Sequence, residues 1–331
     1  ISRGGIHWQP GIEEAQRCWS VPVGLQKRWW DGAVKEDANV EKITFQSGGL
    51  QLAGSLHRPV NGPGPVPGLV VCHGFGGNSC GAGYRILAQG LAEAGYVVLR
   101  FDFRGCGASG GEPGRVIFEE EVEDLKAAVT FLAAQPRVDG GRIAAIGASM
   151  GGAVVICGAA VDTRIRACVA SGAVADGERF CRWQHRDDAG WERFLARLEE
   201  ARQYREATGR SRMMHRFEIV FIPEQMRQGL PPGSCMEFPA ETAISMLGFK
   251  AEKVVGQIAP RPLLILHPAG DLVVPKTESI HLAANAGAPC ELHILAGDNH
   301  FAFDEPEVLQ IIRSWLARHL PVAAGNRARY S

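Results

Sequence analysis

The feature of this sequence that most constrains its fold is an alternation of short apolar runs with helix-length amphipathic stretches. Strand-like and helix-like segments follow one another from Pro67 onward, at residues 68–72, 84–94, 96–101, 118–134, 143–146, 151–161 and 165–170. Apolar runs without two-residue alternation are typical of strands buried on both faces, and their alternation with helices favours right-handed strand–helix–strand units. The sequence therefore predicts an α/β fold with a mostly parallel central sheet flanked by helices.

The pattern also predicts how the chain is divided. Residues 40–45 and 50–57 resemble an antiparallel pair of strands, and the alternation resumes after a break at 262–266, 276–286, 291–295 and 305–320. The break is rich in Arg, Met and aromatic residues and has helical spacing at 191–207. We therefore expect a helical lid after the sixth strand. Most of its aromatic side chains are expected to form a small core within the lid. The expected parts are an N-terminal arm at 1–39, a core at 40–176 and 249–321, the lid insertion at 177–248 and a tail at 322–331.

Two Gly-x-Ser-x-Gly segments occur, one around Ser109 and one around Ser149. Acyl-transfer enzymes hold a nucleophilic serine on a tight turn from a strand to a helix, and small residues two before and two after the serine permit that turn. Ser149 follows the apolar run 142–146 and precedes the helix-like run 152–160, whereas Ser109 precedes Gly-Gly-Glu-Pro-Gly, which cannot open a helix. We therefore predict that Ser149 is the nucleophile and that Ser109 lies in a surface loop.

A tetrahedral intermediate also needs two preorganised N–H donors. The backbone N–H of Met150, directly after Ser149, is one candidate. The apolar run 69–72 leads into the glycine-rich residues 73–77, where glycines let the backbone approach a substrate, so the N–H of Phe75 is the other. Taken alone, this segment fits a plain glycine turn before a helix equally well. We interpret His73, at the end of a buried strand, as a hydrogen-bonded structural residue.

The general base must be a histidine that reaches Ser149, and loops at the carboxyl ends of parallel strands can bring one there. Among ten histidines, His300 is placed in a loop that leaves a late predicted strand. Asp271 has the analogous position one strand earlier and is expected to orient the imidazole. Asp298 and Asp304 are nearer to His300 in sequence, but we interpret them as solvated or capping carboxylates.

With Ser149, Asp271 and His300 in this order and His-Gly-Phe-Gly-Gly at 73–77, the chain resembles the α/β-hydrolase superfamily over about residues 40–321. Residues 102–109 also look like the loop after the fourth strand of many members. The most similar groups are serine aminopeptidases, dienelactone hydrolases and acyl esterases. The resemblance implies the fold, the triad and cleavage of esters, thioesters and some amides without a cofactor, but it does not extend to the insertion or the arm.

These observations predict a serine hydrolase that cleaves an ester, thioester or amide of a small, partly apolar acyl substrate, with an acyl-enzyme on Ser149 and neither metal nor cofactor. An acyltransferase and a carbon–carbon bond hydrolase or lyase are alternatives on the same triad. A non-catalytic ligand receptor is disfavoured, because all three triad positions are filled. Six arginines of the insertion could meet a substrate carboxylate, although we expect most to be solvated: Arg182, Arg186, Arg193, Arg197, Arg202 and Arg205.

Composition excludes several other partners. A formal net charge of -1, from 35 basic and 36 acidic residues, provides no field for nucleic acid or an anionic membrane surface. No apolar run approaches the about 20 residues of a membrane span. Nine scattered cysteines indicate a reduced cytoplasm and no structural zinc. The absent initiator methionine leaves a removed leader open, and the sequence leaves open whether the protein is a homo-oligomer.

Overall fold

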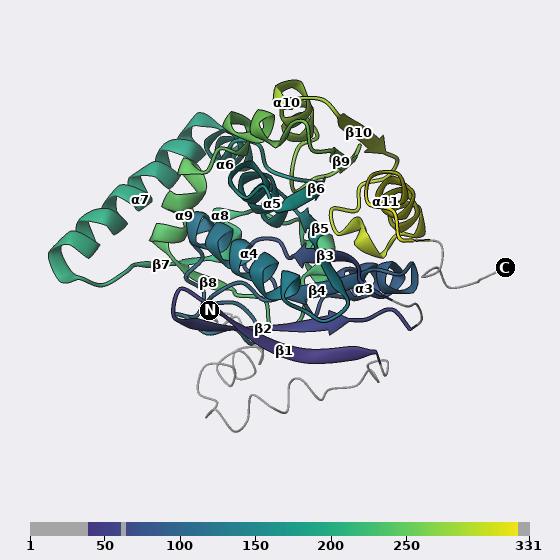
Figure 1. Ribbon diagram of the computed structural model, residues 1–331. Helices are drawn as coiled ribbons and strands as arrows, with labels where there is room; N and C mark the ends of the chain where they lie inside the picture. The colour runs from purple at the N-terminus through teal and green to yellow at the C-terminus, as the bar shows by residue number, and fades with distance from the viewer. Residues whose placement is uncertain (1–38, 61–63, 324–331) are drawn as a thin grey trace, which may run out of the picture. The chain divides into compact units, whose positions relative to one another are not determined.

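An eight-stranded sheet forms the centre of the fold, in the order β1-β2-β4-β3-β5-β6-β9-β10 (Figure 1). The computed structural model describes residues 39–60 and 64–323, so nearly all of the predicted arm and most of the predicted tail lie outside the described residues. The strands are β1 (Val40–Ser47), β2 (Leu50–His57), β3 (Val66–Cys72), β4 (Val97–Phe101), β5 (Val138–Ala148), β6 (Ile165–Ser171), β9 (Leu263–Pro268) and β10 (Cys290–Leu295).

The pairing of the strands confirms the predicted α/β class. β2 pairs in antiparallel fashion with β1 and β4, and all other pairs in this sheet are parallel. β3, β4 and β9 are buried at every position, as expected of strands covered on both faces. β5 is longer than predicted, because Val138 already pairs with Val66 before a shift of register at Gly68. The glycines at 140 and 141 hide this extension in the sequence.

Helices cover both faces of the sheet (Figure 1). α3 and α11 contact each other on one face, and α4 and α5 contact each other on the other. The helices of this core are α3 (Ala82–Glu93), α4 (Phe118–Ala133), α5 (Met150–Val161), α10 (Thr277–Asn285) and α11 (Pro306–His319), with short 3-10 helices η2 (Ala251–Lys253), η3 (Val255–Ile258) and η4 (Ala302–Asp304). In the described residues, no helix combines the length and the apolar character needed to cross a bilayer.

The segment between β6 and β9 contains more than helices. Its elements are α6 (Gly177–His185), α7 (Asp188–Thr208), β7 (Met213–His215), α8 (Arg216–Ile219), η1 (Glu224–Gly229), β8 (Glu237–Pro239) and α9 (Ala240–Gly248). β7 and β8 form a two-stranded antiparallel sheet, which the sequence did not predict because each strand has only 3 residues. Several aromatic side chains of this segment are buried, among them Phe180, Trp191, Phe194 and Phe238.

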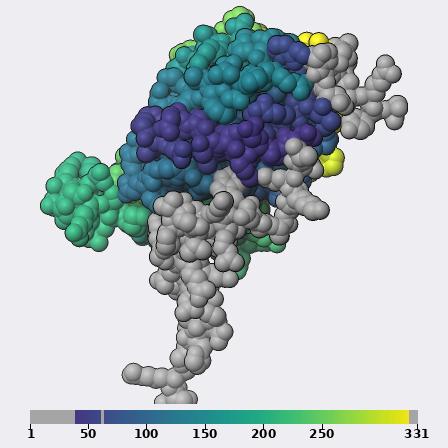
Figure 2. All heavy atoms as spheres, turned by 60° about the horizontal axis from the view of Figure 1, so that its bottom comes forward, coloured from purple at the N-terminus to yellow at the C-terminus, as the bar shows by residue number. Residues whose placement is uncertain are grey.

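The surface of the described part shows two edges of this arrangement. β1 runs along one face in purple, with exposed side chains at Glu41 and Lys42 (Figure 2). The end of α7 stands clear of the core in both views, and none of its residues after Ala201 is buried (Figures 1 and 2). The buried residues of α7 are therefore confined to its first part, which attaches the helix to the rest of the fold.

Candidate active site

The loops after β3 and β5 meet where the order of the strands reverses. β3 lies between β4 and β5, and its last residue, Cys72, is the parallel partner of Gly147 near the end of β5. In open α/β sheets, ligands bind at the carboxyl ends of the strands at such a reversal. The glycine-rich residues 73–77 and the turn at Ser149 therefore share the place where the fold puts a binding site.

Ser149 lies on a strained turn between β5 and α5. Its backbone has φ 55° and ψ −128°, a conformation that a residue with a side chain rarely adopts. The flanking glycines permit the turn, because a Cβ at Gly147 would collide with the carbonyl of Gly151, and a Cβ at Gly151 would collide with the carbonyl of His73. The N–H of Ser149 donates to the carbonyl of Ser171 at 2.8 Å. The turn is thus anchored to the end of β6, and the Ser149 side chain is half-buried.

The two candidate oxyanion donors flank this turn. A Cβ built on Gly74 would lie 3.2 Å from the Cβ of Ser149, so the glycine allows the loop after β3 to approach the serine closely. The N–H of Gly74 donates to the hydroxyl of Tyr84 at 2.9 Å. The Phe75 ring stacks on a phenylalanine ring of the insertion, with 4.4 Å between the ring centroids. Within residues 39–60 and 64–323, the N–H groups of Phe75 and Met150 have no hydrogen-bond acceptor. Both N–H groups are therefore consistent with the predicted role of oxyanion donors.

The side chains of Asp271 and His300 form a direct hydrogen bond. The Nδ1–H of His300 donates to Oδ2 of Asp271 at 2.6 Å, and both side chains are almost completely buried. Oδ1 of Asp271 accepts from the N–H groups of Val273 and Val274 at 2.8 and 3.0 Å. Burial opposes ionisation of Asp271, but the nearby His300 and these hydrogen bonds outweigh it and lower the pKa of the carboxyl below its usual value. Asp271 is therefore a carboxylate at neutral pH.

The end of β6 brings this pair and the serine together. Gly172 follows β6, and a Cβ built there would lie 3.4 Å from Nδ1 of His300 and 3.6 Å from Oδ2 of Asp271. The preceding residue, Ser171, accepts the hydrogen bond from Ser149. The structure thus gathers the three residues predicted as a triad around residues 171 and 172. Among the described residues, neither Asp298 nor Asp304 forms an ion pair with His300.

His267 and Gln184 also belong to this site, although the sequence predicted no role for either. The ring nitrogens of His267 bond to the Ser279 hydroxyl at 2.7 Å and the Val274 carbonyl at 3.0 Å, and Nε2 lies 3.6 Å from Oδ2 of Asp271. Burial lowers the pKa of His267, which keeps the ring neutral. Its position four residues before the predicted acid was a usable signal. Gln184 of α6 donates to the Val273 carbonyl, a contact for which the sequence held no signal.

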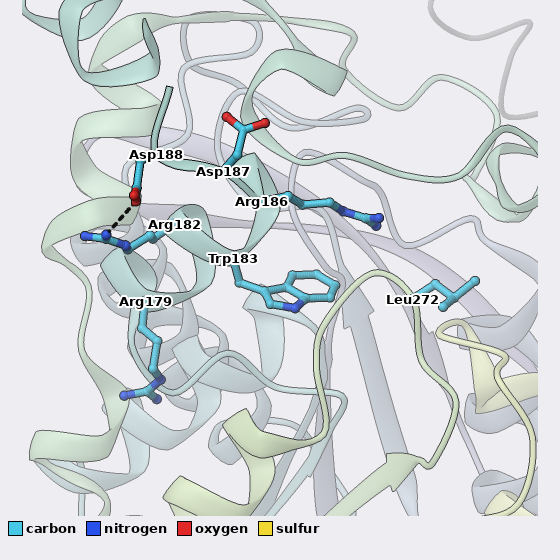
Figure 3. A pocket seen from close by; sticks show the side chains of 7 residues that line it. All are labelled: Arg179, Arg182, Trp183, Arg186, Asp187, Asp188 and Leu272. Carbon is cyan, nitrogen blue, oxygen red and sulfur yellow. Dashed lines mark hydrogen bonds and ion pairs between the residues drawn. The ribbon is translucent and has the colours of Figure 1, made fainter. Parts of the chain in front are cut away.

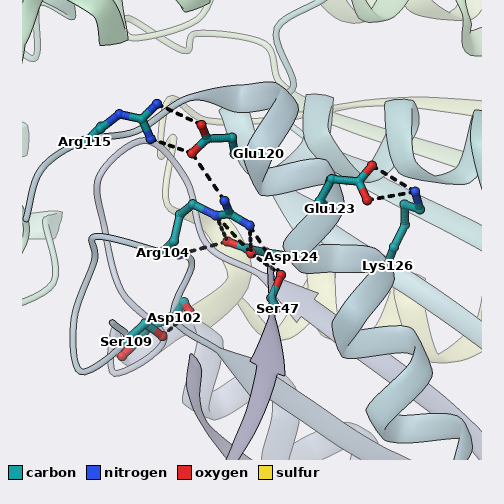
Figure 4. Close-up of polar contacts among 9 residues, drawn as sticks. All are labelled: Ser47, Asp102, Arg104, Ser109, Arg115, Glu120, Glu123, Asp124 and Lys126. Carbon is teal, nitrogen blue, oxygen red and sulfur yellow. Dashed lines mark hydrogen bonds and ion pairs between the residues drawn. The ribbon is translucent and has the colours of Figure 1, made fainter. Parts of the chain in front are cut away.

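Two residues that resemble catalytic groups have structural surroundings. Nε2 of His73 accepts from the N–H of Phe103 at 3.1 Å, its Nδ1 donates to the Gly74 carbonyl at 2.8 Å, and burial lowers its pKa. The hydroxyl of Ser109 donates to the Asp102 carbonyl at 2.5 Å and accepts from the N–H of Ala53 at 2.9 Å. Ser109 and Asp102 lie at one side of the ion-pair cluster around Arg104 (Figure 4). Both side chains therefore form hydrogen bonds to backbone groups and stabilise the loops in which they lie. The described residues contain no group of three or more His, Cys, Asp or Glu placed to hold a metal.

A parallel sheet with a strained serine turn and a histidine–aspartate pair at its carboxyl end defines the class of α/β-hydrolases. The chain belongs to the family described as serine aminopeptidase, S33, whose model matches residues 65–307. It is therefore an enzyme of the hydrolase type.

Three relatives illustrate the range of similar proteins. The uncharacterized protein PA2218 of Pseudomonas aeruginosa is 29% identical over 322 residues, covering 89% of this chain and 85% of the relative, and its crystal structure superposes with a TM-score of 0.75 at 26% identity, covering 88% and 97% of the two chains. The polyketide transferase grgF of a Penicillium species is 28% identical over 305 residues, or 86% of this chain and 97% of the relative. The thiohydrolase aneE of Aspergillus aculeatus is 37% identical over 141 residues, or 41% of each chain.

Proposed function

We propose that this chain is a serine hydrolase that cleaves a carboxylic ester or thioester through an acyl-enzyme on Ser149. The observation that carries the proposal is the buried bond of 2.6 Å between His300 and Asp271 beside the strained turn of Ser149. Because Nδ1–H of His300 is donated to Asp271, the other ring nitrogen is left unprotonated in the neutral imidazole and serves as the base.

The proposed reaction has two halves. His300 Nε2 takes the proton of the Ser149 hydroxyl as its oxygen attacks the carbonyl carbon, and the N–H groups of Phe75 and Met150 donate to the developing oxyanion. His300 then protonates the leaving alcohol or thiol as the acyl-enzyme forms. In the second half, the same nitrogen takes a proton from a water molecule that attacks the acyl carbon, and His300 then gives this proton to the oxygen of Ser149 as the bond to the acyl group breaks and the acid leaves. Asp271 stays ionised throughout and stabilises the imidazolium.

The insertion supports the substrate side of this proposal. It leaves the sheet after Ser171, at the edge where the serine turn and the histidine–aspartate pair lie, and we infer that it acts as the lid of the site. The Phe75 ring stacks on Phe238 of the insertion at 4.4 Å, so the candidate oxyanion loop packs against the insertion through buried aromatic rings. For a site covered in this way we propose a small, partly apolar acyl substrate.

Acyl transfer is the second candidate function. The polyketide transferase grgF aligns over 86% of this chain, and the thiohydrolase aneE aligns over 41%. Transfer and hydrolysis share the acyl-enzyme and differ only in whether an alcohol, amine or water attacks it. Product analysis with an added alcohol separates the two, because a transferase forms the new ester in preference to the free acid.

Labelling with a fluorophosphonate probe tests the nucleophile. We expect one adduct, located at Ser149 by peptide mass spectrometry, and no adduct in Ser149→Ala. Ser109→Ala is the matched control, since it alters the other Gly-x-Ser-x-Gly segment and should keep both the adduct and the activity on p-nitrophenyl esters. Ester cleavage without labelling of Ser149 would refute the assignment.

A further inference from the structure

A cavity lies beside the loop that carries Asp271. Its volume is about 600 Å³, and it is lined by Arg179, Arg182, Trp183, Arg186, Asp187, Asp188 and Leu272. Leu272 directly follows Asp271, and its side chain is 43% exposed. The other lining residues belong to α6, to the junction between α6 and α7 and to the first residue of α7, so the insertion and the acid loop form this cavity together (Figure 3).

Three arginines and two aspartates line the cavity, and among the described residues neither Arg186 nor Asp187 forms an ion pair; Asp187 instead accepts from the N–H of Gly190. Arg179 pairs with two glutamates at 2.7 and 2.8 Å, and Arg182 pairs with Asp188 at 3.1 Å. Among the residues that the structure describes, no carboxylate lies within ion-pair distance of Arg186. Its guanidinium instead lies over two aromatic rings, 5.4 Å from the centroid of Phe221 and 5.8 Å from that of Trp183. In Figure 3, Arg186, Trp183 and Leu272 lie on the same side of the cavity, away from the paired arginines.

The backbone of Arg186 is strained. Arg186 caps α6 with φ 56° and ψ −34°, in the half of conformational space that favours glycine. Strain of this kind concentrates at ligand-binding and catalytic positions. Here it accompanies a guanidinium at the cavity wall that has aromatic neighbours but, among the described residues, no carboxylate partner.

α6 is also fixed to the acid loop. Nε2 of Gln184 donates to the Val273 carbonyl at 2.7 Å, and Oε1 of Gln184 accepts from the N–H of Phe221 at 2.9 Å. The N–H of Val273 in turn donates to Asp271. α6, whose C-terminal cap is Arg186, is therefore hydrogen-bonded to the loop that carries Asp271.

We propose that this cavity is a binding site for an anionic group of the substrate, with Arg186 binding a carboxylate and Trp183 and Leu272 contacting the adjoining apolar chain. The inference rests on the proposed function, because it names the substrate class of the same site: acyl esters or thioesters that carry a second, ionised carboxyl group. A guanidinium suits this task, since its planar N–H groups bind a carboxylate through two parallel hydrogen bonds.

The kinetic test uses two substrates that differ only in charge. Mono-p-nitrophenyl suberate carries a free carboxylate, and p-nitrophenyl methyl suberate carries the same chain with that group capped. We expect the wild-type kcat/KM to be about tenfold or more higher for the free carboxylate, as a charge-assisted hydrogen bond provides. In Arg186→Gln this ratio should fall to about one with the capped ester unaffected. Arg193→Gln, which alters an exposed arginine outside the cavity, should keep the wild-type ratio.

A binding measurement separates this inference from the proposed function. Calorimetry with octanoate and its neutral analogue octanamide needs no turnover, and octanoate should bind Arg186→Gln at least tenfold more weakly than wild type. If neither ester is cleaved and Ser149 resists labelling while octanoate binding depends on Arg186, the proposed function fails and the site stands. If the esters are cleaved at equal rates, or octanoate binding is unchanged in Arg186→Gln, the site is refuted and the proposed function stands.

Discussion

Gln184 connects the insertion to the loop that carries Asp271, the proposed catalytic acid. Its side chain is 7% exposed, and both ends of its amide are used, at the Val273 carbonyl and the Phe221 N–H. Replacing Gln184 with Met keeps the length of the side chain and removes both hydrogen bonds. The substitution therefore isolates the polar contact from packing.

The expected cost depends on how buried each partner is. Val273 is 2% exposed, so its carbonyl loses a donor that water cannot replace, at about 1–3 kcal/mol. Phe221 is 40% exposed, so water can reach its N–H and the loss is nearer the net value of an ordinary hydrogen bond, about 0.5–1.5 kcal/mol. We expect Gln184→Met to lower the free energy of unfolding by about 1.5–4.5 kcal/mol. Because Val273 also donates to Asp271, kcat should fall about 10- to 100-fold.

Urea unfolding and ester kinetics measure the two effects. Gln184→Met should lower the urea midpoint at an unchanged m-value. Gln203→Met is the matched control, because Gln203 makes one exposed hydrogen bond within α7, and it should change stability by less than about 0.5 kcal/mol. Equal urea midpoints for the two variants would refute the predicted contribution of the Gln184 hydrogen bonds to stability. A loss of stability with an unchanged kcat would refute its role in positioning Asp271.

Three further predictions concern the same framework. Asp271→Asn should lower kcat about 10⁴-fold in stopped assays at pH 7, because the histidine loses its orienting acceptor. Gly151→Ala should cost more than about 2 kcal/mol in urea unfolding, because its Cβ meets the His73 carbonyl, whereas Gly248→Ala, with open space around it, should be neutral or stabilising. The pKa of Asp271 is lowered on folding, so its stabilisation is complete above its unfolded pKa of about 4 and is lost as pH falls through the lower folded value. The stability difference between wild type and Asp271→Asn should accordingly shrink between pH 5 and pH 3.

Much of the sheet could be predicted from the sequence because its strands are buried on both faces. The runs in β3, β4 and β9 are apolar throughout, so their periodicity is unambiguous. The first half of β5 was missed, because pairing with β3 across a shifted register holds a segment whose glycines have turn-like composition. The strands β7 and β8 were missed for a related reason, since their pairing depends on residues more than twenty positions apart.

In the candidate site, too, some features could be predicted from the local sequence and others depend on contacts between distant segments. The position of Ser149 could be predicted from local rules, because it alone of the two Gly-x-Ser-x-Gly serines lies between a buried strand and a helix, whereas the glycine turn at Phe75 gained its meaning only together with Ser149. The pairing of His300 with Asp271 could be predicted from the order of the strands, since adjacent parallel strands deliver their loops to the same edge. The contact of Gln184 with Val273 depends on how a distant helix docks, and no local pattern encodes it.

The end of β6 explains how one framework can accept different insertions. β6 supplies no predicted catalytic side chain, yet the Ser171 carbonyl anchors the turn of Ser149, and Gly172 gives room to His300 and Asp271. The hydrogen bond from Ser149 is accepted by the backbone of Ser171, and the space beside His300 exists because Gly172 has no side chain. Neither feature depends on the residues of the insertion. The chain leaves for the insertion five residues after Gly172 and returns through Gln184 to the acid loop. The surroundings of the substrate can therefore change with the insertion while the geometry of the reacting groups is kept, provided that the insertion retains a contact equivalent to that of Gln184.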